Sequence, residues 1–133
     1  MGPSGSPALY QVGQTVHGPQ SIDLKVGSVV FDPSGNYLYF PLPGGGRWVS
    51  VQLTMHNGWS KPYATGGLMT LDFQVHDSQG GSIGPSGAQH TPQLTGPIMP
   101  GETATGWMSF AVPASGGLRL VWVPAHAEVQ LTT

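Results

Sequence analysis

The sequence Pro-Gly-Glu-Thr-Ala-Thr-Gly-Trp-Met-Ser-Phe-Ala-Val-Pro, residues 100–113, decides the fold class of this chain. It begins with a Pro-Gly turn and continues as a strand in which Met108 and Phe110 share one face. After a short corner, Leu118 to Val123 alternates in the same way and turns Trp122 toward the same interior. Two apolar-faced segments joined by a glycine-containing corner are typical of antiparallel β-strands.

The same two-residue rhythm recurs along the chain, in segments separated by Gly, Pro, Asn and Asp. The expected strands are Tyr10–Val16, Ile22–Phe31, Tyr37–Phe40, Arg47–Asn57, Leu68–Asp77, Thr103–Val112 and Leu118–Val123, with edge strands at Leu94–Met99 and Ala127–Leu131. Long helices are implausible, because no window of about 12 residues has a helical period free of Gly and Pro. The pattern predicts an all-β, immunoglobulin-like antiparallel two-sheet β-sandwich.

The length of 133 residues predicts one domain. We assign residues 9–133 to the β-sandwich and residues 1–8 to a flexible leader or linker, because this start is rich in Gly, Pro and Ser. It has neither the charged region nor the apolar region of a signal peptide.

Gly106 occupies an inner-face position of the Thr103–Val112 strand. Because glycine has no side chain, it predicts a bulge or a close contact with a facing aromatic ring. The large side chains near it, Phe110 and Trp122, would each contribute about 1.5–3 kcal/mol when fully buried.

The charge pattern excludes several kinds of partner. Charged residues make up 8% of the chain and its formal net charge is −2, without a basic cluster. We therefore expect no nucleic-acid binding.

No apolar run approaches the roughly 18–20 residues that span a bilayer, so we expect no direct membrane insertion. The chain has no cysteine, which excludes a disulfide or a thiol nucleophile.

Several segments together resemble a known family. They are Val12–Val16, Arg47–Asn57 with its terminal asparagine, Leu71–Gly80, the Pro-Gly-Glu…Gly…Phe-x-Val-Pro pattern of residues 100–113, and Leu118–Pro124. In this order they resemble the telokin-like domain of unknown function found on bacterial surface lipoproteins, and the related mycobacterial immunoprotective secreted antigen family. The resemblance covers residues 10–124 and implies an immunoglobulin-like sandwich that is secreted or held at the cell surface. It implies no catalytic residues. Members are often tethered through a lipidated N-terminal cysteine, which this chain lacks, so we expect that the anchor was trimmed or never existed.

The residues themselves also predict no enzyme. No Gly-x-Ser-x-Gly motif lies between a strand and a helix, and the glycine-rich loop at residues 82–87 lacks the lysine and helix that hold a phosphate. The six acidic residues are scattered, mostly at turns, which does not suit a pair of catalytic carboxylates.

Histidines provide one hypothesis for a cofactor. The chain has five, and His56 and His76 each end the polar face of a predicted strand. If these strands paired, the two imidazoles would meet near Asp77 and bind copper or zinc. The alternative interpretation is that these histidines are solvated strand ends, with no cofactor.

Aromatic residues provide a second hypothesis. Trp59 and Tyr63 lie beside Lys61 in a long loop, and Trp48 lies on the polar face of its strand. An exposed patch of Trp48, Trp59 and Tyr63 would bind a protein or a cell-envelope component. In the alternative interpretation, Trp59 folds back over the open end of the core.

The leading functional hypothesis is a non-enzymatic, extracellular binding or interaction module of a bacterial surface or secreted protein. One alternative is a periplasmic or extracellular metal-binding domain. Another is a self-assembling surface protein, because low charge and open sheet edges favour homo-oligomers and added strands.

Overall fold

The computed structural model describes residues 8–32, 47–63, 72–85, 94, 97–113 and 116–132. The predicted strand at Tyr37–Phe40, the beginning of the predicted Leu68–Asp77 strand and nearly all of the predicted leader lie outside these residues. Ala8, which we assigned to the leader, begins the first strand.

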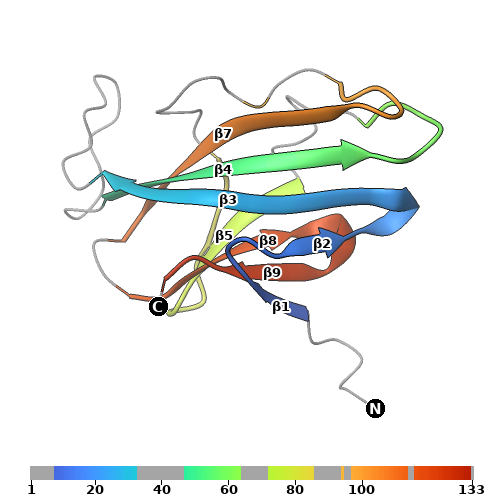
Figure 1. Ribbon diagram of the computed structural model, residues 1–133. Helices are drawn as coiled ribbons and strands as arrows, with labels where there is room; N and C mark the ends of the chain where they lie inside the picture. The colour runs from blue at the N-terminus through green and yellow to red at the C-terminus, as the bar shows by residue number, and fades with distance from the viewer. Residues whose placement is uncertain are drawn as a thin grey trace, which may run out of the picture.

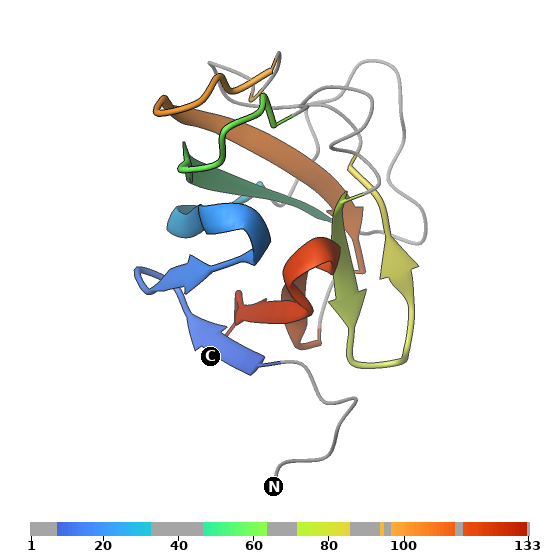
Figure 2. The ribbon, with the colours of Figure 1, turned by 90° about the vertical axis from the view of Figure 1, so that its right-hand side faces the viewer.

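Two sheets form the molecule and pack as layers (Figures 1 and 2). One sheet has the order β1-β9-β8-β5-β6 and the other has the order β2-β3-β4-β7. The elements are β1 (Ala8–Gln11), β2 (Thr15–His17), the 3₁₀ turn η1 (Pro19–Ser21), β3 (Ile22–Asp32), β4 (Arg47–Asn57), β5 (Phe73–Asp77), β6 (Ser82–Ile83), β7 (Thr103–Val112), β8 (Leu118–Trp122), the 3₁₀ turn η3 (Val123–Ala125) and β9 (Ala127–Gln130). The prediction of an all-β, two-sheet immunoglobulin-like sandwich is confirmed.

The four-stranded sheet is built on three long antiparallel strands. β4 lies in its centre and pairs with β3 and β7 over nearly its whole length. The predicted bounds of β4 and β7 are confirmed. In β3 the register shifts between Val26 and Ser28, which marks a bulge at Gly27.

The five-stranded sheet corrects two predictions. The predicted Tyr10–Val16 strand is divided between β1 and β2, which belong to different sheets, and Gly13 turns the chain between them with φ of +94°. The predicted edge strand Ala127–Leu131 is an interior strand, because β9 pairs with β8 on one side and in parallel with β1 on the other.

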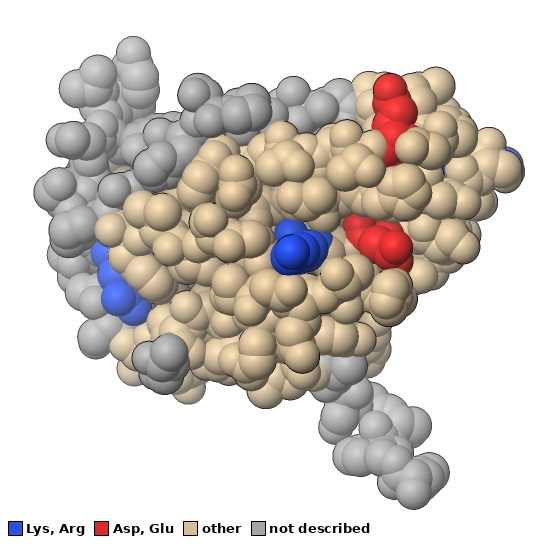
Figure 3. All heavy atoms as spheres, in the orientation of Figure 1, with Lys and Arg blue, Asp and Glu red and all other residues tan. Residues whose placement is uncertain are grey.

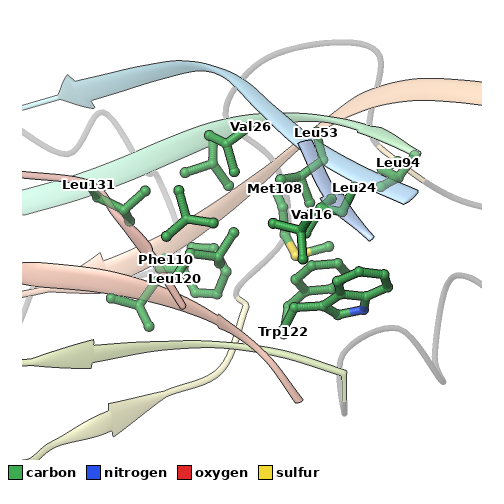
Figure 4. Close-up of a cluster of buried hydrophobic side chains, with 14 of the residues drawn as sticks. Val16, Leu24, Val26, Leu53, Leu94, Met108, Phe110, Leu120, Trp122 and Leu131 are labelled. Carbon is green, nitrogen blue, oxygen red and sulfur yellow. The ribbon is translucent and has the colours of Figure 1, made fainter. Parts of the chain in front are cut away.

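The core lies between the two sheets, where their apolar side chains point toward one another (Figure 4). Each long strand contributes every second residue, as its alternating sequence predicts. The largest fully buried side chains there include Trp122, Phe73 and Phe110. The rings of Phe73 and Trp122 stack with their centroids 6.3 Å apart, which joins β5 to β8.

The outer face of the four-stranded sheet carries the complementary set of side chains. On β4, the residues between the buried Leu53 and Asn57 are the half-buried Thr54, the buried Met55 and the exposed His56. Thr54 and His56 therefore face outward, with their neighbours from the other three strands. This face is the candidate site.

Candidate functional site

One row of polar residues crosses all four strands of the sheet in register. His17 on β2 pairs with Asp23 on β3, Asp23 pairs with His56 on β4, and His56 pairs with Thr103 on β7. Residues directly opposite each other on one face have their Cβ atoms about 4.5–5.5 Å apart. The pairing of the four strands therefore brings together side chains from three separate parts of the sequence, residues 17–23, His56 and Thr103.

Hydrogen bonds between side chains join the four residues of this row into two pairs. Nδ1 of His17 donates to Oδ1 of Asp23 at 2.8 Å, and this pair is largely exposed. Nδ1 of His56 lies 2.9 Å from Oγ1 of Thr103. Each imidazole is thus bonded through Nδ1, and its second nitrogen, Nε2, has no partner among the described residues.

A second row lies two residues further along the strands. Thr15 pairs with Lys25, Lys25 with Thr54, and Thr54 with Thr105. The hydroxyls of Thr54 and Thr105 lie 3.0 Å apart. In the part of the chain that the structure describes, the ammonium of Lys25 has no ion pair.

The two rows border a surface pocket of about 200 Å³. Its lining residues are Thr15, Asp23, Leu24, Lys25, Thr54 and His56. On this side of the molecule, basic and acidic groups are few and stand in a mostly uncharged surface (Figure 3). The pocket thus contains both hydrogen-bond donors and hydrogen-bond acceptors, and its net charge is small.

Trp107 extends this face on β7. It is half-buried, it pairs with Gln52 of β4, and it follows Thr105 by two residues on the same side of the strand. Sequence reasoning missed Trp107, His17, Asp23, Lys25 and the threonines as site residues. The sequence pattern does show that these residues face outward from their strands. It does not show that they lie side by side, because that depends on which strands pair.

The predicted exposed aromatic patch is not formed as expected. Trp48 does lie on the outward phase of β4, but its side chain is only 1% exposed, so the expectation of an exposed ring at this position is wrong. Its neighbours Ser50 and Ser109 are also fully buried, and their hydroxyls lie 2.7 Å apart. The alternating pattern correctly predicts that Trp48 lies on the outer side of β4. It does not predict that the outer face is buried at this end of the strand.

Trp59 and Tyr63 are partly buried and pack against the core. The hydroxyl of Tyr63 donates to Oδ2 of Asp72 at 2.5 Å and accepts from Nε1 of Trp122 at 3.4 Å. Burial, and then the bond to Asp72, raises the pKa of Tyr63 well above its ordinary value. These contacts favour the interpretation in which the loop covers the end of the core, and Lys61 lies over the Trp59 ring at 5.7 Å.

The predicted metal ligands lie on different sheets. His56 belongs to β4, whereas His76 and Asp77 belong to β5, and these strands do not pair. His76 lies 3.2 Å from Oε1 of Gln74, and Asp77 accepts from the backbone of Gln79 and Gly81 in its own turn. The expected meeting of His56 with His76 is therefore wrong. Within the described residues, no group of three or more His, Asp or Glu side chains is arranged to hold a metal ion.

Solved structures of bacterial proteins share this fold. YjhA of Bacillus subtilis has a TM-score of 0.67 and 16% identity, over 92% of this chain and 99% of that one. The candidate lipoprotein ycdA of the same organism has a TM-score of 0.64 and 13% identity, over 90% of this chain and 38% of that one. The secreted protein MPT63 of Mycobacterium tuberculosis has a TM-score of 0.53 and 16% identity, over 87% of this chain and 90% of that one.

No curated protein matches the chain in sequence. No helix among the described residues is long and apolar enough to cross a membrane. A family match covers most of the chain, from residue 10 to residue 127, and agrees with the resemblance seen in the strand motifs. The chain belongs to the family described as domain of unknown function DUF4352.

Proposed function

We propose that this chain is a non-enzymatic, extracytoplasmic binding module that contacts a cell-envelope component or a protein through the outer face of its four-stranded sheet. The observation that carries the proposal is the in-register row His17–Asp23–His56–Thr103 beside the pocket. A sheet face that only needs to be soluble does not require four polar groups in one line that are joined in hydrogen-bonded pairs. A contact surface uses such groups to recognise a ligand.

An extracytoplasmic location is supported by two structural relatives, of which one is a secreted protein and one a candidate lipoprotein. The low charge of the chain is compatible with a surface that is recognised by hydrogen bonds rather than by long-range attraction.

The absence of catalysis is supported by the way the polar row is bonded. A histidine activates a hydroxyl nucleophile when a third group, usually a carboxylate, orients the imidazole. Here Asp23 binds His17, whereas the hydroxyl of Thr103 lies beside His56. The carboxylate and the hydroxyl thus belong to two separate pairs, which suits recognition better than turnover.

The proposal can be tested by retention on washed cell envelopes of Bacillus subtilis, the source of two structural relatives. We expect saturable depletion of the purified chain from solution. A double variant, Asp23→Ala with His56→Ala, should weaken the apparent affinity by about tenfold or more, equivalent to about 1.4 kcal/mol.

The matched control is His76→Ala, which removes an imidazole from the outer face of the other sheet and should change retention by less than about twofold. Circular dichroism verifies that both variants are folded. Retention that does not saturate, or that is equal in the wild type and the double variant, contradicts the proposal.

A further inference from the structure

The charges in the pocket balance each other. Of its six lining residues, Asp23 carries a negative charge and Lys25 a positive one. They are two residues apart on the same face of β3, so their Cα atoms lie about 6.6 Å apart. Lys25 attracts an anion, but Asp23 repels it. Asp23 attracts a cation, but Lys25 repels it. The pocket therefore favours a ligand without net charge.

The polar groups of the pocket suit a ligand that both donates and accepts hydrogen bonds. Oδ2 of Asp23 can only accept, the ammonium of Lys25 can only donate, and the hydroxyl of Thr15 can do both. None of these groups has a partner within the described parts of the chain. A polyhydroxylated molecule matches such a mixture, because each of its hydroxyls donates one bond and accepts others.

The half-buried Trp107 adds an apolar surface to these polar groups. It is diagonal to Thr54, which lines the pocket, and diagonal neighbours across strands are about 7–8 Å apart. One or two sugar rings bridge this spacing. The C–H face of a sugar packs on an aromatic ring while its hydroxyls remain available for the polar row.

We infer that the outer face of the four-stranded sheet binds a neutral saccharide, with its hydroxyls in the pocket beside Asp23 and Lys25 and a ring against Trp107. This inference rests on the proposed function and specifies its ligand class. A small zwitterion would also balance the two charges, but it has no C–H face that could pack on the Trp107 ring.

The test is a titration of the ¹⁵N-labelled chain with chitotriose and with maltotriose, followed by two-dimensional NMR. We expect saturable shift changes with at least one of them, confined to residues 15–25, 52–56 and 103–107. Trp107→Ala and Asp23→Asn should each weaken binding by about fivefold or more. Trp107→Phe should retain most of the affinity, and Gln74→Ala, on the outer face of the other sheet, should leave it unchanged.

Parallel titrations use inorganic phosphate, glycine and Zn²⁺ alone. If neither trisaccharide gives saturable shifts at tens of millimolar, or if Trp107→Ala and Asp23→Asn bind like the wild type, the inference is overturned. Saturation by phosphate, glycine or zinc without saccharide binding overturns it as well. The proposed function survives such a result if envelope retention still depends on Asp23 and His56, and fails only if that dependence is also absent.

Discussion

Asn57 is fully buried at the end of β4, and its side chain ties two loops to the strand. Its Nδ2 donates to the carbonyl oxygens of Lys61 and Ile98, both at 2.8 Å, and its Oδ1 accepts from the backbone N–H of Trp59 at 2.8 Å. Its side chain thus makes three hydrogen bonds in the interior. This role accounts for an asparagine at the end of a long apolar strand.

Replacement of Asn57 by alanine should lower the free energy of unfolding by about 2–4 kcal/mol, because it leaves buried backbone groups of both loops without their partner. Urea denaturation followed by tryptophan fluorescence measures the change. Ser60→Ala, in the exposed part of the same loop, is the control and should cost less than about 0.5 kcal/mol. A similar loss in both variants would contradict the anchoring role of Asn57.

Tyr63 makes the stability of the fold sensitive to alkaline pH. Its phenol has a pKa raised by burial and by Asp72, whereas an unfolded tyrosine ionises near pH 10. Above that pH the unfolded chain releases the proton first. The contribution of Tyr63 is therefore complete below about pH 10 and decreases above it, by at most about 1.4 kcal/mol per pH unit.

Unfolding free energies measured at several pH values between about 9 and 11 check this prediction. Tyr63→Phe should be less stable than the wild type at neutral pH by about 1 kcal/mol, because it loses the bond to Asp72, and should decline less steeply above pH 10. Equal slopes for the two proteins would show that Tyr63 is not the group responsible.

At the level of the strand, two glycines on the strands that flank β4 have opposite roles, Gly27 on β3 and Gly106 on β7. A Cβ on Gly106 would lie 2.6 Å from the backbone nitrogen of Leu94, which donates to the carbonyl of Trp107. The close contact predicted for Gly106 is present, but with this backbone rather than with an aromatic ring. A Cβ on Gly27, at the bulge, would lie 3.6 Å from Oε1 of Gln52 and 4.0 Å from its backbone oxygen, which are ordinary van der Waals contacts.

Gly106→Ala should therefore lower the free energy of unfolding by about 1–3 kcal/mol, because the backbone at Leu94 must move. Gly27→Ala is the matched control; since its φ is not in the left-handed region, it should be neutral or stabilise by up to about 1 kcal/mol. Thermal unfolding of the two variants side by side checks the contrast. A loss at position 27 as large as that at position 106 would contradict it.

Strand positions could be predicted from the sequence because alternation is a local property. The phase change in β3 was not predicted, because the three residues that follow Ser28, at positions 29, 30 and 31, are all apolar and do not show which of them face the core. Strand partners could not be predicted in this way, because pairing joins residues that are far apart in the chain. For this reason the expected meeting of His56 with His76 failed, and the row that joins His56 to Asp23 was missed.

At the scale of the whole molecule, stability depends on the apolar core and on backbone pairing rather than on charge. Only 8% of the residues are charged. Among the described residues, Arg119–Glu128 is an ion pair that joins β8 to β9, and His17–Asp23 is an exposed pair that carries opposite charges only when His17 is protonated. Exposed pairs contribute about 0–1 kcal/mol and are screened by salt.

We therefore expect the free energy of unfolding to change by less than about 1 kcal/mol between roughly 0.02 and 0.5 M NaCl. Urea denaturation at the two salt concentrations measures it. Arg119→Met should be less stable than the wild type, because the largely buried Glu128 loses its cation, and this deficit should shrink as salt screens the pair in the wild type. A strong salt dependence in the wild type, undiminished by Arg119→Met, would mean that electrostatic interactions other than this pair support the sandwich.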